Sequence, residues 1–383
     1  FAVRIFKKAK KQQNFGIGSK NGGEKGSKND GKNGGCGEEL RGRIARVCES
    51  LAARGVFVRR QSDLVTAEIS PIGIGGTCAA AFYPDTLASL TELVSALKKA
   101  KIPYAVLGSA ANVLIPDGSE TGEAANVLIP DGSETGEAGG EKGNENGGGH
   151  YVLRGAIVFT KYLRSLAIDG ESVFAFCGVT GAELLYRVRE ADLAGAEFLE
   201  GIPCTAGGAA YMNAGAGGRH MSDVVESVLA YGDGDMRVYT AKECGYAYKK
   251  SAFMDSGEII LGVTLRLKKS SSAAVEAGAA RAREARAHLP KGKSLGCVFK
   301  NPPPLVADER RISAGALIEQ AGMKGRKIGG AAVSETHANF IINEGGATYE
   351  NVRSLIEEVR RAVYETHGVR LEEEIRYLND LWR

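Results

Sequence analysis

The sequence predicts an α+β protein built from more than one lobe. Its 383 residues exceed the usual size of a single domain, so two or three lobes sharing a cleft are expected. Short apolar runs at 173–177 and 259–267 are mixed with a helical stretch at 181–191, which is typical of an α+β domain. After Gly368 the chain alternates apolar and polar residues with the period of a strand.

The N-terminal segment, residues 1–40, is expected to be a disordered extension. It is rich in Gly, Lys, Asn and Ser, a composition that cannot bury enough apolar surface to order itself. Nine Lys or Arg among residues 1–35 against two acidic residues give this segment a charge of +7, whereas the whole chain carries +3. Because the remainder is slightly acidic, no nucleic-acid partner is expected. The missing initiator Met suggests a fragment or a processed chain, and a basic leader leaves an organelle-targeting peptide open.

A helix, a strand and a glycine turn are expected between residues 86 and 108. An exact tandem repeat follows, since residues 110–123 and 124–137 have the same fourteen-residue sequence. Only the first copy directly follows the strand at 102–107, so residues 124–149 are expected to be a looped-out insertion. The apolar residues on one face of the helix are Leu87, Leu90, Leu93, Val94 and Leu97.

The second half predicts two more helices and two strands. Residues 271–288 suggest a surface helix that leads into a strand containing Cys297. Residues 348–367 suggest a longer amphipathic helix that stops at Gly368. On the strand after it, Glu374 and Arg376 share the polar face.

Several classes of site are excluded by missing motifs. Seven scattered cysteines contain no C-x-x-C pair, which favours a reducing compartment, and five histidines contain no H-E-x-x-H, so no metal is expected. No apolar run approaches the eighteen residues of a membrane helix, so no membrane partner is expected. Residues 292–294 resemble the end of a Walker loop, but Ala287 stands where its first glycine belongs, and no Rossmann fingerprint follows a strand.

Three motifs carry the chemistry. The stretch 201–218, GIPCTAGGAAYMNAGAGG, has six glycines that let backbone amides approach a flat or anionic group. The run 296–302, GCVFKNP, places a titratable thiol among apolar residues. The run 371–376, LEEEIR, follows near the end of the sequence.

In this order, the three motifs resemble the flavin-dependent UDP-N-acetylenolpyruvoylglucosamine reductases over roughly residues 60–380. The resemblance implies a two-lobed FAD-binding fold of the vanillyl-alcohol-oxidase/PCMH type with a C-terminal α+β substrate domain. It also implies lobe 1 at 41–112 completed by 369–383, lobe 2 at 113–266 and a substrate domain at 267–368. Since no room exists between Leu267 and Lys291 for an extra tyrosine-bearing lobe, the chain resembles the shorter branch.

The resemblance implies that two loops hold FAD. The first has Ala110 and Ala111 where the family usually has Gly and Ser, and in the second Cys204 replaces a Gly. Each change adds a Cβ where backbone approaches phosphate, and Ala111 removes a hydroxyl donor. The implied FAD-binding residues are Gly108, Ser109, Ala110, Ala111, Asn112, Ile202, Pro203, Thr205, Gly207, Gly208, Asn213, Ala214 and Gly215.

The implied catalytic residues are Cys297, Glu374 and Lys249. Cys297 stands where the family usually has a serine that protonates C2 of the substrate, and a thiol that is mostly neutral at pH 7 can donate that proton. Glu374 is implied to stabilise the enol intermediate. Lys249 replaces an arginine, keeping the positive charge but losing the two-pronged donor geometry. The implied substrate-binding residues are Tyr248, Asn301, Gln320 and Arg376.

The implied activity is the reduction of UDP-N-acetylglucosamine enolpyruvate to UDP-N-acetylmuramate for peptidoglycan synthesis. FAD is the cofactor, NADPH the co-substrate, and the only partner expected is this small UDP-sugar. A cytoplasmic monomer is expected, with an organelle such as a plastid as the alternative location. Two other functions stay open: an FAD-dependent oxidase of a small alcohol or lactone, and a degenerate flavin-binding homologue without turnover, which the substitutions and the repeat motivate.

Overall fold

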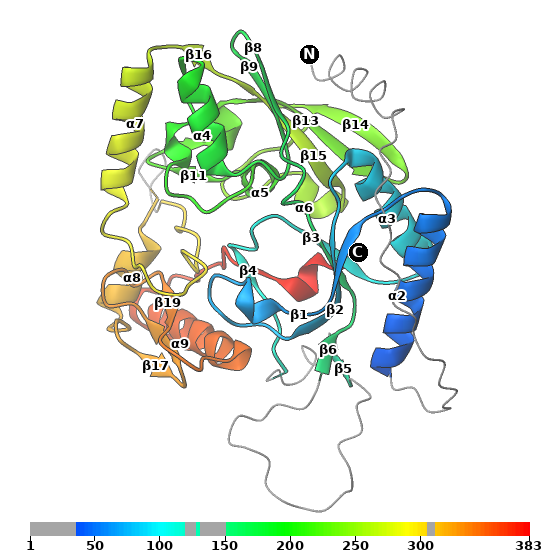
Figure 1. The fold of residues 1–383 in the computed structure, drawn as a ribbon. Coiled ribbons are helices and arrows are strands. Elements are labelled where there is room, and N and C mark those ends of the chain that lie inside the picture. The colour runs from blue at the N-terminus through cyan, green and yellow to red at the C-terminus, as the bar shows by residue number, and fades with distance from the viewer. Residues whose placement is uncertain (1–35, 119–127, 131–150, 305–310) are drawn as a thin grey trace, which may run out of the picture.

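The fold is described by a computed structural model that covers residues 36–118, 128–130, 151–304 and 311–383 (Figure 1). Two large sheets and a C-terminal lobe surround the middle of the molecule, where the last residues of the chain also lie. The predicted N-terminal extension up to residue 35 lies outside the described residues, and so does most of the predicted insertion. Among the described residues, no helix combines the length and the apolar character needed to cross a bilayer.

The first sheet is mostly parallel and packs against two helices. Its strands run in the order β3-β7-β2-β6-β5, with β1 paired to β2. Helix α3 begins as predicted, because the Thr86 side chain accepts a hydrogen bond from Ser89 N at the N-cap. The elements are α2 (Cys36–Ala53), β1 (Arg59–Val65), η1 (Thr66–Glu68), β2 (Thr77–Tyr83), α3 (Leu87–Lys99), β3 (Tyr104–Leu107), β5 (Leu128–Pro130), β6 (Tyr151–Leu153) and β7 (Ala156–Phe159).

Three features of this sheet differ from the sequence expectation. Helix α2 starts at Cys36, inside the segment expected to be disordered, because Leu40, Ile44 and Val47 bury a stripe in the core beside α3. Residues 128–130 of the second repeat copy pair with β6 at the edge of the sheet. Strands β6 and β7 pair in parallel with β2, so residues 151–159, expected in lobe 2, belong to the first sheet.

The second sheet is antiparallel in the order β14-β13-β15-β9-β8. Its strands are β8 (Leu166–Asp169), β9 (Ser172–Phe176), β13 (Val225–Gly232), β14 (Asp235–Thr240) and β15 (Ile259–Arg266). One face packs against the first lobe, and the other packs under a layer of helices (Figure 1). The accompanying elements are α4 (Gly181–Glu190), β10 (Leu193–Ala194), η3 (Glu197–Leu199), α5 (Ala206–Met212), β11 (Gly215–Ala216), β12 (Arg219–His220), η4 (Met221–Asp223), α6 (Phe253–Ser256), β16 (Lys268–Lys269) and α7 (Ser272–Ala285).

The C-terminal lobe packs a small antiparallel sheet against a long helix. Helix α9 (Tyr349–His367) is capped by Thr348 and ends at Gly368, which has a φ of 67°, as the sequence predicts. Its buried stripe joins Ile72, Ile74 and Leu114 of the first lobe in one core, which fixes this lobe against the first sheet. The other elements are α8 (Ala314–Gln320), β17 (Lys327–Ile328), β18 (Ala331–Val333) and β19 (Ile341–Asn343).

The chain after α9 returns to the first lobe. Strand β20 (Arg376–Tyr377) pairs in parallel with β4 (Val113–Leu114), η5 (Leu378–Leu381) follows, and Arg383 exchanges backbone hydrogen bonds with Tyr104. The expected long terminal strand is therefore reduced to a short ladder. The expected strand around Cys297 is likewise replaced by isolated bridges, because Cys297 pairs with Phe340 and Phe299 pairs with Glu373, so the chain changes partners within two residues.

Candidate active site

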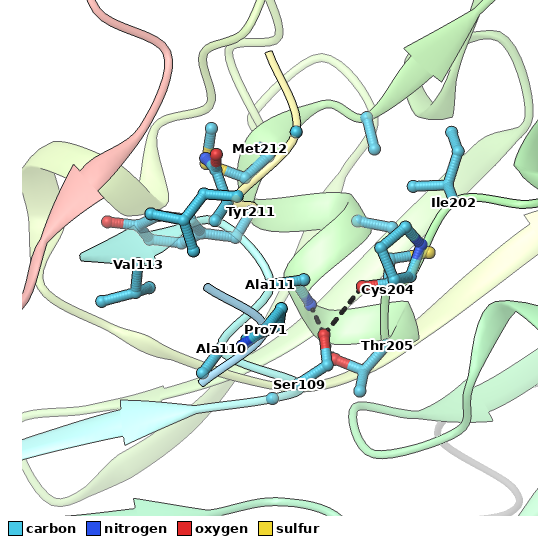
Figure 2. Close-up of a pocket in the computed structure, with 18 of the residues that line it drawn as sticks. Pro71, Ser109, Ala110, Ala111, Val113, Ile202, Cys204, Thr205, Tyr211 and Met212 are labelled. Carbon is cyan, nitrogen blue, oxygen red and sulfur yellow. Dashed lines mark hydrogen bonds between the residues drawn. The ribbon is translucent and has the colours of Figure 1, made fainter. Parts of the chain in front are cut away.

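The motif residues converge on one cavity of about 800 Å³ where the lobes meet. Its walls come from the loop after β3, the loop before α5, the segment after α7 and the residues around Cys297 and Glu374. Figure 2 shows part of this wall, with Ser109 and Ala110 of the first loop facing Cys204 and Thr205 of the second. A cavity of this size suits a large cofactor.

The two glycine loops contact each other directly, and Gly108 makes that contact possible. A Cβ on Gly108 would lie 2.3 Å from Thr205 Oγ1, so any side chain there would push the loops apart. Ser109 Oγ donates to Pro203 O at 2.9 Å, which ties the loops together. In the described structure, the N–H groups of residues 109–112 donate to no backbone carbonyl. The backbone N–H groups of this loop are therefore not used in secondary structure where it lines the cavity.

The second loop is held by the start of α5 and by close packing on the second sheet. Thr205 Oγ1 accepts a hydrogen bond from Gly208 N at 3.2 Å. A Cβ on Gly207 would lie 2.7 Å from Cys177 Cβ, so glycine is required for the helix to reach this depth.

All but one of the predicted FAD-binding residues line the cavity. Asn213 is the exception: it is buried with a φ of 45°, donates from Nδ2 to Ala247 O and accepts Ser222 N at Oδ1. Its side chain therefore supports the loop. The lining residues are Gly108, Ser109, Ala110, Ala111, Asn112, Ile202, Pro203, Thr205, Gly207, Gly208, Ala214 and Gly215.

Ala110 carries strain that the family's glycine would avoid. Its φ is 53°, in the left-handed region, where a Cβ costs about 1–2 kcal/mol. Ala110→Gly is therefore expected to raise the free energy of unfolding by about 0.5–1 kcal/mol, after subtracting the greater backbone entropy of glycine in the unfolded chain. Thermal unfolding of the flavin-free protein measures this difference.

Ala111→Gly is the matched control, since Ala111 is the next residue and has no positive φ. There the substitution only adds unfolded-state entropy, and a loss of about 0.5–1 kcal/mol is expected. Equal effects of the two changes would contradict the assignment of strain to Ala110.

Cys297 and Glu374 are brought together by pairing of two segments that are far apart in sequence. Glu374 N donates to Val298 O at 2.7 Å, and Lys300 N donates to Glu372 O at 2.8 Å. Asn339 holds the other side, because its Oδ1 accepts Phe299 N and its Nδ2 donates to Phe299 O. The Cys297 segment thus lies between two partners, and Cys297 lines the cavity with Glu374.

Lys249 completes this group. Its Nζ lies 2.6 Å from Glu374 Oε1, and both side chains are only about 15 % exposed. Asn112 fixes the same strand, since its Nδ2 donates to Glu374 O at 2.9 Å and its backbone O accepts Arg376 N. The first glycine loop is therefore hydrogen-bonded to the backbone segment that carries Glu374 of the Lys249–Glu374 pair.

The Cys297 thiol stays neutral at physiological pH. Burial and, after it, the nearby Glu374 carboxylate raise its pKa from 9.0 to about 11, although Lys249 and Arg286 act in the opposite direction. A neutral thiol is the form that can donate a proton.

The predicted substrate-binding residues separate into two groups. Arg376 lines the cavity, whereas Tyr248 and Asn301 meet outside its lining, with Tyr248 Oη accepting Asn301 N at 3.3 Å. The Arg311 guanidinium lies 4.0 Å from the centre of the Tyr248 ring. Gln320 is exposed at the end of α8 and does not line the cavity.

Sequence reasoning missed several residues at this site. Arg286 lines the cavity from the segment after α7. Asn339, in the loop before β19, forms hydrogen bonds with the Cys297 segment. No motif marked Arg286, because it is one of several arginines at the end of α7 and nothing in the local sequence distinguishes it. Glu373, on the apolar side of the terminal segment, hydrogen-bonds to Arg360 and Tyr377, which explains a carboxylate at that position.

The cavity fits FAD. Both glycine loops line the cavity with backbone, which suits a diphosphate, and the cavity has room for a dinucleotide. The described residues bring no three metal-ligating side chains together.

The fold and the site together define a class: an FAD-dependent oxidoreductase with a two-lobed flavin-binding fold and a C-terminal substrate domain. The family model of the UDP-N-acetylenolpyruvoylglucosamine reductase C-terminal domain matches residues 287–378. The chain belongs to the UDP-N-acetylenolpyruvoylglucosamine reductase family, and the predicted fold class and FAD cofactor are confirmed.

Three relatives illustrate the match. The chain is 30 % identical over 336 residues to the UDP-N-acetylenolpyruvoylglucosamine reductase of Lactobacillus delbrueckii subsp. bulgaricus, covering 86 % of this chain and 98 % of the relative. It is 33 % identical over 333 residues to that of Geobacter metallireducens, covering 85 % and 95 %. The crystal structure of the Thermus caldophilus enzyme superposes with a TM-score of 0.63 and 28 % identity, covering 84 % of this chain and 98 % of that one.

Proposed function

We propose that this chain reduces UDP-N-acetylglucosamine enolpyruvate to UDP-N-acetylmuramate with electrons from NADPH, in the synthesis of peptidoglycan precursors. One observation carries the proposal: Cys297, Lys249 and Glu374 face the same cavity as the two glycine loops. When bound, FAD supplies the hydride chemistry between NADPH and the enolpyruvyl group.

Lys249 acts on the substrate carboxylate. Hydride addition at C3 of the enolpyruvyl group pushes electrons toward C2 and the carboxylate, so negative charge grows there. The Lys249 side chain is largely buried beside Glu374, and a fixed positive charge in a poorly solvated site stabilises such charge more than water does. Glu374 keeps the lysine oriented, because the two side chains are in contact at 2.6 Å.

Cys297 completes the reaction by protonating C2. The thiol S–H bond breaks, a C–H bond forms at C2, and the thiolate recovers a proton from solvent. The raised pKa keeps the thiol protonated at neutral pH, and Arg286 and Lys249 stabilise the thiolate that remains after proton transfer.

Substrate-dependent NADPH oxidation tests the proposal. Purified protein is expected to hold or take up FAD, seen by visible absorbance, and to oxidise NADPH only when the UDP-sugar enolpyruvate is added. Failure to bind FAD would favour the degenerate homologue, and oxygen consumption with a small alcohol, without NADPH, would favour the oxidase. The cavity of about 800 Å³ lined by both glycine loops argues against the degenerate homologue.

The setting proposed for this reaction is the bacterial cytoplasm, with the protein acting as a monomer. The relatives described above come from bacteria, and no comparison favours an organelle. Light scattering of the purified protein tests the monomer.

A further inference from the structure

Arg286 is a half-buried cation on the cavity wall whose charge is not neutralised. It lies just after α7, and its Nη2 donates to Gly201 O at 3.3 Å. Among the described residues, no carboxylate lies within ion-pair distance of its guanidinium. Burial lowers the pKa of this guanidinium below its ordinary value.

Arg283, one turn earlier, shows the usual arrangement on the same helix. It is 57 % exposed and pairs with Glu200 at 3.2 Å and Glu276 at 3.7 Å. Arg286 is more enclosed and has only a backbone carbonyl as a partner. A buried cation without an anion loses hydration free energy that nothing offsets. An anionic ligand bound next to it would offset that loss.

The surroundings of Arg286 place such an anion inside the cavity. Its charge acts on two neutral thiols, Cys204 of the second glycine loop and Cys297 of the catalytic group. A Cβ on Gly201, which has a φ of 71°, would lie 3.3 Å from Arg286 Nε, so the guanidinium rests directly on the loop backbone. Arg286 therefore lies between the loop proposed to hold FAD and the residue proposed to protonate the substrate.

We propose that Arg286 binds the diphosphate of a nucleotide in this cavity. The guanidinium offers planar paired donors that match phosphate oxygens, and a single weak backbone contact leaves most of them free. The inference rests on the proposed function, which brings two nucleotide diphosphates to this cavity: that of FAD and that of the UDP-sugar.

Two binding measurements test the proposal without relying on turnover. FAD is titrated into flavin-stripped full-length protein and followed by flavin fluorescence, and UDP is titrated into the FAD-loaded protein and followed by calorimetry. Arg286→Met is expected to weaken one of these affinities by about 10- to 100-fold, the effect of losing a charged hydrogen bond. Arg286→Lys keeps the charge without the fork and is expected to lose less.

Arg281→Met is the matched control. Arg281 is exposed on α7 and does not line this cavity, so both affinities are expected to stay within about threefold of wild type. Weaker FAD binding by Arg286→Met assigns the residue to the cofactor diphosphate, and weaker UDP binding assigns it to the substrate side.

Unchanged affinities for both ligands in a folded Arg286→Met protein would overturn this inference, and so would equal losses in the Arg281 control. If Arg286→Met does not fold, Arg286→Lys carries the test, and affinities equal to wild type there and in Arg286→Gln would overturn it as well. A wild-type protein that binds no FAD would instead overturn the proposed function.

Discussion

Cys297→Ala is expected to slow reduction of the UDP-sugar enolpyruvate by a factor of about 10² to 10⁴, because the reaction loses its proton donor at C2. The rate at which NADPH bleaches the flavin absorbance should stay near wild type, since that step needs no proton from residue 297. Rapid mixing of the protein with NADPH, and then with the UDP-sugar substrate, measures the two rates separately.

Cys297→Ser is the matched control, because it restores the hydroxyl donor that the family usually has at this position. It is expected to recover most of the lost rate, while the Ala variant does not. Wild-type substrate reduction by Cys297→Ala would exclude the thiol as the acid.

The pH dependence separates the thiol from other donors. Since burial and Glu374 raise the Cys297 pKa to about 11, the rate of substrate protonation should stay level from pH 7 to about 9 and fall as pH approaches 11. Cys297→Ser should lack this alkaline fall.

The raised pKa of Cys297 also affects the pH dependence of stability. Its contribution to the free energy of unfolding is fully present below the ordinary thiol pKa of 9.0 and is lost as pH rises through the folded-state pKa of about 11.

The parts of the fold predicted best are those with local signals. The helix at 348–367 combines a capping threonine, a regular apolar stripe and a terminal glycine, and α9 occupies that range. The glycine loops were found because only glycine permits the contacts of Gly108 and Gly207. Here the local sequence and the tertiary contacts require the same residues.

The parts predicted poorly depend on contacts between distant segments. Strands β6 and β7 join the first sheet across the inserted repeat, and no local pattern records which sheet a short apolar run enters. The Cys297 segment has strand composition but divides its pairing between Phe340 and Glu373. Its environment therefore depends on residues 40 to 80 positions away in sequence.

The candidate site shows the same division. Family motifs place Cys297, Lys249 and Glu374 on the cavity, yet Asn213 proves to be a buried support, and Arg286 carries no motif. A residue is recognised from sequence when its chemistry requires a fixed neighbour in the chain. Arg286 has its role, as we infer it, from the path of the chain after α7, which the sequence does not encode locally.

Removing either member of the Lys249–Glu374 pair is expected to cost both stability and activity. Lys249→Met leaves an unpaired carboxylate and Glu374→Met an unpaired ammonium, each in a site about 15 % exposed, and the free energy of unfolding should fall by about 3 kcal/mol in each. Substrate reduction should fall by about 10² to 10³ in Lys249→Met, which loses the positive charge that stabilises the developing anion, and should also fall in Glu374→Met, where the ammonium loses the carboxylate that orients it. Chemical unfolding and steady-state rates measure the two effects.

The double variant Lys249→Met/Glu374→Met distinguishes a catalytic pair from a structural one. Two apolar side chains of similar volume satisfy each other, so stability should return to within about 1 kcal/mol of wild type. Activity should remain at the level of the single variants, because no charge is left to act on the substrate carboxylate. Lys249→Arg, which keeps the charge and restores the two-pronged donor, should retain activity. Recovery of activity in the double variant would show that the pair only holds the fold together.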